Sequence, residues 1–250
     1  MQKRDYKKAL VLFSGGQDSS TVLAWALSKY DQVDTVGFDY GQRHIVELGA
    51  RRTVRQAFAD HSDAWKDRLG KDMLIDFAAF GRLGETAMTT EVEITTDDDG
   101  MPSTFVPGRN LAFLIFAGAA AYRSGAGVLV AGMSQADYSG YPDCRKETLE
   151  AQMQALCLGM DTDIRLETPL MHISKADTWQ LAEDIGGDAL VDVIVEHSHT
   201  CYLGARDTRH VWGYGCGDCP ACGLRAAGWA AYKGDGDGDG DGDAAPANPS

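Results

Sequence analysis

The sequence has no hydrophobic run long enough to cross a membrane. Residues 1–8 are mostly polar, and the apolar segment Ala9–Phe13 is too short for the hydrophobic region of a signal peptide. We therefore expect a cytoplasmic protein that has no membrane partner.

Positive charge is also scarce. Lysine and arginine total 23 residues against 37 aspartates and glutamates, which gives a net charge of −14 over 250 residues. Five of the aspartates lie in a Gly/Asp run at 235–243, yet the charge of −9 that remains without them is still acidic. Since proteins bind polynucleotides largely through Lys and Arg contacts to phosphates, we expect no nucleic acid partner. A small anion can still bind to backbone amides and a few basic side chains.

The six cysteines are not expected to form a disulfide framework in a reducing cytoplasm. Four of them lie near the end of the chain, at Cys201, Cys216, Cys219 and Cys222. Four thiolates suit the closed tetrahedral site of a structural Zn²⁺ ion. An iron–sulfur cluster is the alternative, and His197, His199 or His210 could replace one ligand.

Strands and helices alternate along the first 185 residues. The apolar pattern predicts strands at 9–13, 33–38, 73–77 and 127–133, and helices at 18–30, 44–61, 110–122, 147–160 and 175–185. Such alternation is typical of a doubly wound parallel α/β sheet. A ligand should then bind beyond the carboxyl ends of the strands.

Composition divides the chain into three parts. We expect an α/β domain at 1–196, followed by a zinc knuckle and helix at 197–233, where Cys, Gly and aromatic residues dominate. Residues 234–250 cannot bury apolar surface, so a disordered Gly/Asp tail is expected. The tail lacks the bidentate Glu that closes an EF-hand loop, which argues against calcium.

A turn rich in glycine and serine, SGGQDSS at 14–20, joins the first strand to the first helix. Gly15 and Gly16 let the backbone approach an anion, and the free amides of the helix start point at it. Asp18 would hold Mg²⁺ or cap the helix. The turn lacks the Lys of a Walker A loop and resembles the SGGxDS loop of the PP-loop ATP pyrophosphatases. The resemblance implies ATP-binding residues at Phe13, Ser14, Gly15, Gly16, Gln17, Asp18, Ser19, Ser20 and Thr21.

Other polar strings follow the strands at the same edge of the sheet. Arg109 opens a helix, where it could pair with phosphate or carboxylate, and Lys175 offers another anion contact. The loop at 136–145 combines two acids, two tyrosines and an arginine, which suits the donor edge and flat ring of a guanine-like ligand. Cys144 in this loop could touch the substrate. A surface charge or a polar turn is the alternative for each.

Seven strings, in this order, resemble the 7-cyano-7-deazaguanine synthase family of the queuosine pathway between Leu10 and Trp229. They read FSGGQDSS, YGQRH, FVPGRN, DYSGYPDCR, TPLMHISK, TCY and CGDCPACGLR. The resemblance implies a homodimer with an adenine nucleotide alpha hydrolase-like fold, a structural zinc, ATP and Mg²⁺. It further implies a ligase that forms C–N bonds and converts 7-carboxy-7-deazaguanine and ammonia to the nitrile, through adenylated carboxylate and amide intermediates.

The same resemblance implies roles for individual residues. The candidate catalytic residues are Asp18, Arg109 and Lys175. The candidate substrate-binding residues are Tyr40, Arg43, Asp137, Tyr138, Tyr141, Asp143 and Arg145. Two alternatives are a PP-loop tRNA-modifying enzyme of the thiolase type and a zinc-ribbon binding module, and the acidic charge argues against both.

Overall fold

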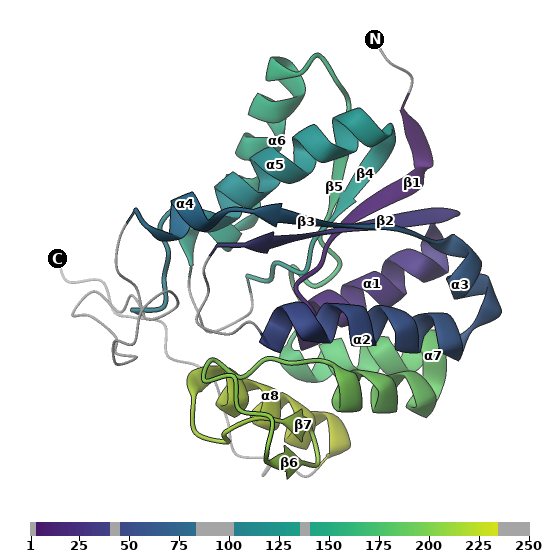
Figure 1. The fold of residues 1–250 in the computed structure, drawn as a ribbon, viewed down its shortest axis with the longest axis vertical. Coiled ribbons are helices and arrows are strands. Elements are labelled where there is room, and N and C mark those ends of the chain that lie inside the picture. Colours follow the sequence, from purple (N-terminus) through teal and green to yellow (C-terminus); the bar gives the residue numbers. More distant parts are fainter. Residues whose placement is uncertain (1–3, 41–45, 84–102, 136–140, 235–250) are drawn as a thin grey trace, which may run out of the picture.

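The computed structural model describes residues 4–40, 46–83, 103–135 and 141–234, and its centre is a five-stranded sheet (Figure 1). The strands are β1 (Asp5–Leu12), β2 (Gln32–Asp39), β3 (Leu69–Asp76), β4 (Ala126–Val130) and β5 (Arg165–Glu167). They stand in the order β3-β2-β1-β4-β5, and every neighbouring pair is parallel. The predicted parallel sheet is therefore confirmed.

Helices cover both faces of this sheet, as Figure 1 shows. One face carries α1 (Gln17–Lys29), α2 (Val46–His61) and α7 (Lys175–His197), and the other carries α5 (Arg109–Ser124) and α6 (Lys146–Gly159). Shorter helices are α3 (Asp63–Arg68), α4 (Ala78–Gly81) and the 3₁₀ helix η1 (Pro142–Cys144). The predicted doubly wound α/β architecture is confirmed.

The apolar sequence of β1 explains its central place. Ala9 and Val11 pack with residues of α1 and α7, whereas Leu10 between them packs with residues of α5 on the opposite face. All three side chains are fully buried. A parallel strand covered on both faces needs apolar residues at successive positions, and β1 meets this requirement.

The strand order places the site. In the sheet, β1 lies between β2, which is the next strand along the chain, and β4, which comes later in the chain. The turn after β1 enters α1 on one face, and the chain after β4 leads to α6 on the other face. In doubly wound folds, connections that diverge in this way open a crevice at the carboxyl ends of the strands.

Some elements were not foreseen. β5 has three residues, too few for a hydrophobic period, and α3 was also missed. The helix predicted at 175–185 is longer in the structure, where α7 continues to His197. Gly187 has a φ of 66°, so it marks a kink between two helical stretches rather than an end.

The last described helix, α8 (Pro220–Lys233), packs on α7 and confirms the predicted C-terminal helix. The ring of Trp229 stands edge-on to that of Trp179 in α7, with 5.0 Å between their centroids. Trp179 is fully buried and Trp229 is partly buried against the same apolar cluster, which ties α8 to the sheet domain.

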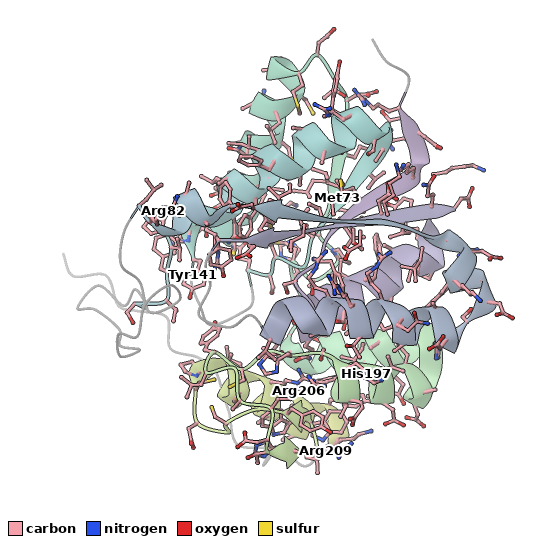
Figure 2. The ribbon with its side chains drawn as sticks, in the orientation of Figure 1. Met73, Arg82, Tyr141, His197, Arg206 and Arg209 are labelled. Carbon is pink, nitrogen blue, oxygen red and sulfur yellow. The ribbon has the colours of Figure 1, made fainter. Side chains whose placement is uncertain are left out.

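Two arginines of the C-terminal segment bind the end of α7 (Figure 2). Arg206 Nη2 donates to the backbone oxygen of Glu196 at 2.7 Å, and Arg209 Nε contacts the Glu196 carboxylate at 3.2 Å. In the chain, α7 and α8 are separated by a small antiparallel ribbon of two strands, β6 (Arg209–His210) and β7 (Gly213–Tyr214).

The boundaries after residues 196 and 233 stay predictions. Residues 235–250 of the Gly/Asp tail and the predicted start of the second helix at His44 lie outside the described residues. Within the described part of the chain, no helix combines the length and the apolar character that spanning a membrane requires.

The first turn of α7, which carries Lys175, is closed by a capping box. Ser174 Oγ accepts from the amide of Asp177 at 3.1 Å, and Asp177 Oδ2 accepts from the amide of Ser174 at 3.0 Å. We expect Ser174→Ala to lower the free energy of unfolding by about 1 kcal/mol in chemical denaturation, because a helix amide loses its acceptor. The control Ser28→Ala, whose exposed hydroxyl donates to the Trp25 carbonyl, should cost less than about 0.5 kcal/mol. Equal losses would contradict the role of the cap.

Candidate functional site

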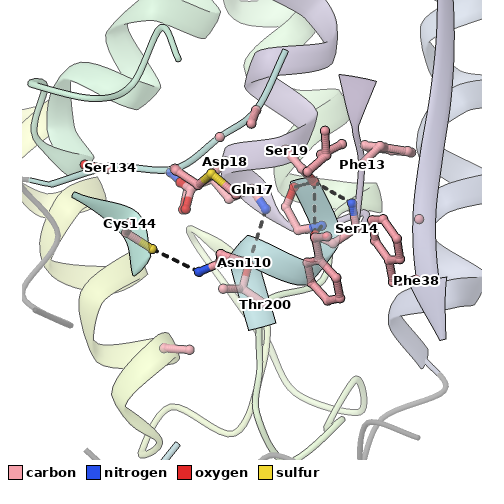
Figure 3. A pocket seen from close by; sticks show the side chains of 18 of the residues that line it. Phe13, Ser14, Gln17, Asp18, Ser19, Phe38, Asn110, Ser134, Cys144 and Thr200 are labelled. Atoms are coloured by element: carbon pink, nitrogen blue, oxygen red, sulfur yellow. Dashed lines mark hydrogen bonds between the residues drawn. The ribbon is translucent and has the colours of Figure 1, made fainter. Parts of the chain in front are cut away.

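A cavity of about 330 Å³ opens at the carboxyl ends of β1, β2 and β4 (Figure 3). Its walls come from the turn after β1, the end of β2, the first turns of α5 and α7, and the segments around Thr200 and Arg225. The predicted site residues that line it are Phe13, Ser14, Gly16, Gln17, Asp18, Ser19, Tyr40, Arg109, Tyr141 and Lys175. The cavity therefore lies where the sheet topology predicts a ligand.

The turn between β1 and α1 gathers backbone amides beside the cavity. Gly15 has a φ of 95°, a conformation that favours glycine. The amides of Ser14 and Gly15 donate to Ser19 Oγ at 3.2 and 3.1 Å, and the amide of Gly16 donates to Ser14 Oγ at 3.2 Å. Because these groups lie at the start of a helix, the turn has the geometry and the dipole of an anion-binding site.

Asp18 and Lys175 form an ion pair in the cavity, with 2.6 Å between Lys175 Nζ and Asp18 Oδ2. The other oxygen, Asp18 Oδ1, is buried and has no hydrogen-bond partner within the described residues. A buried carboxylate oxygen without a donor is costly, so this oxygen is suited to a cation that arrives with the ligand.

Arg109 stands among three tyrosines at another wall of the cavity. Its guanidinium lies 5.9 Å from the centre of the Tyr40 ring, and its Nε is buried without a partner in the described part of the chain. Burial alone would lower the pKa of Arg109, but Tyr40, Tyr141 and Tyr202 together with a nearby carboxylate raise it above its ordinary value. Arg109 is therefore a permanent cation that can pair with an anionic ligand group.

Aromatic rings form the wall beside Arg109. Phe113 of α5 stacks on Phe38 at the end of β2, with 4.2 Å between centroids and 7° between ring planes. The ring of Tyr40 lies 5.7 Å from that of Phe113. A flat apolar wall of this kind suits a planar ring ligand.

Asn110 connects the start of α5 to η1. Its backbone amide donates to Asp143 Oδ2 at 3.0 Å, and its side-chain Nδ2 donates to Cys144 Sγ at 3.1 Å (Figure 3). Cys144 lines the cavity, whereas Asp143 is buried outside the lining and Arg145 is exposed. The substrate roles of Asp143 and Arg145 therefore stay predictions.

The remaining predicted residues are placed as follows. Gly15 offers its amide to the turn without lining the cavity, and Ser20 is buried with its hydroxyl donating to the carbonyl of Gly16 at 2.8 Å. Thr21 is buried in α1 away from the cavity. The predicted residues that lie outside the described part of the chain are Arg43, Asp137 and Tyr138.

The four C-terminal cysteines form a cluster. The Sγ atoms of Cys201, Cys216, Cys219 and Cys222 all lie within 4.8 Å of one another. A tetrahedral zinc site with Zn–S bonds of about 2.3 Å separates its sulfurs by ~3.8 Å, and Cys216 and Cys222 are 3.9 Å apart. Although burial opposes it, donation from the backbone amides of Cys219 and Asp218 lowers the pKa of Cys216 to about 7. In the described residues the cluster contains cysteines alone, and its geometry fits a closed metal site.

Among the lining residues that sequence reasoning did not assign to the site are Arg51, Thr200, Tyr202 and Arg225. Arg51 comes from α2 and crosses Gly37 so closely that a β-carbon at Gly37 would collide with its guanidinium. The strings TCY and CGLR contain the other three residues, but nothing in their local pattern indicates that they fold back to the first strand.

Together, the fold and the site define a doubly wound α/β protein with a glycine- and serine-rich first strand–helix turn beside its cavity and a cluster of four cysteines that could hold a metal ion. The sequence model of one family, described as "Queuosine biosynthesis protein QueC", matches residues 8–233. The chain belongs to this family.

The names of two similar curated proteins agree with this family. The chain is 60% identical over 225 residues to the 7-cyano-7-deazaguanine synthase of Hyphomonas neptunium, which covers 90% of this chain and 94% of the relative. It is 58% identical over 227 residues to the enzyme of the same name from Maricaulis maris, at 91% and 93% coverage. The chain is accordingly an enzyme of queuosine biosynthesis.

Among solved structures, the chain is similar to a 4-thiouridine synthetase in complex with RNA and bound ATP. The TM-score is 0.46 at 16% identity, and the match covers 74% of this chain and 42% of that one. This likeness is too small to inform the site.

Proposed function

We propose that this enzyme converts 7-carboxy-7-deazaguanine and ammonia into 7-cyano-7-deazaguanine at the expense of ATP. The names of the relatives support the product. The observation that carries the proposal is that one cavity joins the anion-binding turn at 14–19 to the cation of Arg109 and an aromatic wall. The cavity can thus hold the phosphates of a nucleotide and a planar carboxylic acid together.

The reaction proceeds in two activations. A carboxylate oxygen of the substrate attacks the α-phosphorus of ATP, and pyrophosphate leaves. Ammonia attacks the acyl carbon, AMP leaves and the amide forms. The amide oxygen then attacks the α-phosphorus of a second ATP and pyrophosphate leaves again. Loss of AMP and of the two nitrogen-bound protons of the amide gives the nitrile. The enzyme mainly orients these groups and neutralises negative charge, because AMP is already a good leaving group.

Asp18 and Lys175 act on the phosphates. Lys175 provides positive charge where the pyrophosphate develops, and Asp18 Oδ2 holds its ammonium in place. Asp18 Oδ1, buried without a donor in the described residues, suits Mg²⁺, which commonly takes one or two carboxylates and completes its shell with phosphate oxygens and water. When bound, Mg²⁺ supplies further charge neutralisation on the transferring phosphoryl group.

Arg109 and the aromatic wall act on the substrate. The guanidinium pairs with the carboxylate that is to be activated, and the deazaguanine ring lies against Tyr40 and Phe113. Tyr141 borders the same space. We retain Arg43, Asp137, Tyr138, Asp143 and Arg145 as substrate-binding candidates on the strength of the family strings alone.

The four-cysteine cluster holds a structural Zn²⁺ ion in this proposal. Four thiolates at tetrahedral spacing leave no open position for a reactant, so the ion stabilises the segment from Cys201 to α8 and takes no part in the reaction. The proposal includes domains at 1–196 and 197–233, a tail at 234–250, a cytoplasmic homodimer and no nucleic acid partner.

Purified protein with ATP, Mg²⁺, ammonium and 7-carboxy-7-deazaguanine should yield the nitrile together with AMP and pyrophosphate, as measured by mass spectrometry. Without ammonium, we expect neither amide nor nitrile to form. ATP that stays intact, or that turns over only after tRNA is added, would contradict the proposal and favour a tRNA-modifying enzyme.

A further inference from the structure

The segment just before the first cluster cysteine lies against the anion-binding turn. The amide of His199 donates to the carbonyl of Gly15 at 3.0 Å, and the amide of Gln17 donates to Thr200 Oγ1 at 3.4 Å (Figure 3). These contacts join residues more than 180 positions apart in the chain. One side of the turn is therefore built by the C-terminal segment.

The Thr200 hydroxyl accepts two hydrogen bonds. One comes from the Gln17 amide and the other from Arg225 Nη1, which lies 2.9 Å from Thr200 Oγ1. A hydroxyl has two lone pairs and one proton, so this oxygen retains only its proton for a further bond. No acceptor for that proton appears within the described residues, and Thr200 lines the cavity.

Arg225 fixes this arrangement. It is 1% exposed, its Nε donates to the carbonyl of Trp212 at 2.8 Å, and its Nη2 donates to that of Ile194 at 3.3 Å. Burial lowers the pKa of Arg225 to about 10, which still leaves the guanidinium charged at neutral pH. A guanidinium cannot accept a hydrogen bond, so Thr200 is held as the acceptor and its proton is directed elsewhere.

We propose that Thr200 donates a hydrogen bond from its hydroxyl to the pyrophosphate portion of ATP bound on the turn at 14–19, and that Arg225 is the positioning residue that orients this hydroxyl. The inference rests on the proposed function, because it takes ATP as the ligand of the turn. Thr200 immediately precedes Cys201, and Arg225 lies three residues after Cys222. The cysteine cluster thus holds both members of the pair at the nucleotide site.

The test compares three variants of the full-length protein by calorimetric titration with pyrophosphate, ATP and AMP. Thr200→Val keeps the shape and removes the hydroxyl, so pyrophosphate and ATP should bind about tenfold more weakly or worse, because a hydrogen bond to a charged group is lost. AMP affinity should change less than about twofold, since AMP lacks the pyrophosphate. Thr200→Ser restores the donor and should bind pyrophosphate within about threefold of the wild type.

Thr178→Val is the matched control, because the Thr178 hydroxyl donates to the carbonyl of Ser174 in α7 and does not line the cavity. It should leave pyrophosphate affinity unchanged. Unaltered pyrophosphate binding by Thr200→Val overturns the inference, and so does an equal loss for AMP or a failure of Thr200→Ser to restore binding. If the wild type forms the nitrile while Thr200→Val binds normally, this inference alone falls. If the wild type binds neither ATP nor pyrophosphate, the proposed function falls with it.

Discussion

Replacement of Asp18 by asparagine should reduce kcat/KM for ATP-dependent turnover by at least about a hundredfold. Asparagine has nearly the same shape but carries no charge and keeps only one oxygen, so it cannot both form the ion pair with Lys175 and offer a charged oxygen to a cation. The release of AMP and pyrophosphate from ATP, followed with the acid substrate and ammonium present, measures the effect. The metal content should stay at the wild-type level, because all four cluster cysteines are intact.

The matched control is Asp177→Asn, which removes an equal charge two residues from Lys175 but at an exposed position outside the cavity. Its turnover should stay within about threefold of the wild type. Lys175→Met should lose about as much activity as Asp18→Asn, and the double variant should be no worse than either, because residues that act as a unit are not additive. Turnover of Asp18→Asn within about tenfold of the wild type would contradict the assigned role.

If the cluster holds zinc as proposed, replacement of Cys219 by serine should abolish zinc binding and unfold the C-terminal segment. Structural zinc sites contribute about 10–16 kcal/mol of apparent binding free energy in small peptides, which is comparable to the whole stability of many domains. Because Thr200 and Arg225 flank the cluster in sequence, ATP affinity should fall together with the metal content. Elemental analysis, thermal melting and ATP titration on one preparation test these three consequences.

Cys157→Ser provides the control for this experiment. Cys157 lies in α6 outside the cluster and its thiol donates to the carbonyl of Ile164 at 3.3 Å, a bond that a serine hydroxyl can replace. Metal content and ATP affinity should therefore match the wild type. Full metal content in Cys219→Ser, or metal loss in Cys157→Ser, would be incompatible with the cluster as the metal site.

The parts of the site that sequence could predict are local in the chain. The turn at 14–20 needs only a buried strand, two glycines, hydroxyl side chains and a helix start, and these lie within a dozen residues. The three-residue steps from Cys216 to Cys222 indicate a metal cluster in the same way. The alternation of strands and helices was enough for the parallel sheet, because each buried strand carries its own apolar signature.

The parts that sequence could not predict depend on contacts between distant segments. Arg225 reads as an ordinary helix cation until its burial against Trp212, Ile194 and Thr200 is known. Likewise, the sequence places Asp143 in a polar loop but does not indicate that its Oδ2 accepts a hydrogen bond from the amide of Asn110 at the start of α5. Neither contact is indicated by a local period or spacing in the sequence.

The serine hydroxyls of the turn at 14–19 have a consequence for binding kinetics. The hydroxyl oxygens of Ser14 and Ser19 already accept hydrogen bonds from the backbone amides that an anion would contact. These bonds hold the turn in its shape before any ligand arrives. The entropy of ordering this segment is lost when the protein folds and not when nucleotide binds. When nucleotide binds, the amides therefore exchange serine oxygens for phosphate oxygens as acceptors, and no loop has to close first. The rate of nucleotide association should then be set by diffusion and charge and not by a conformational step.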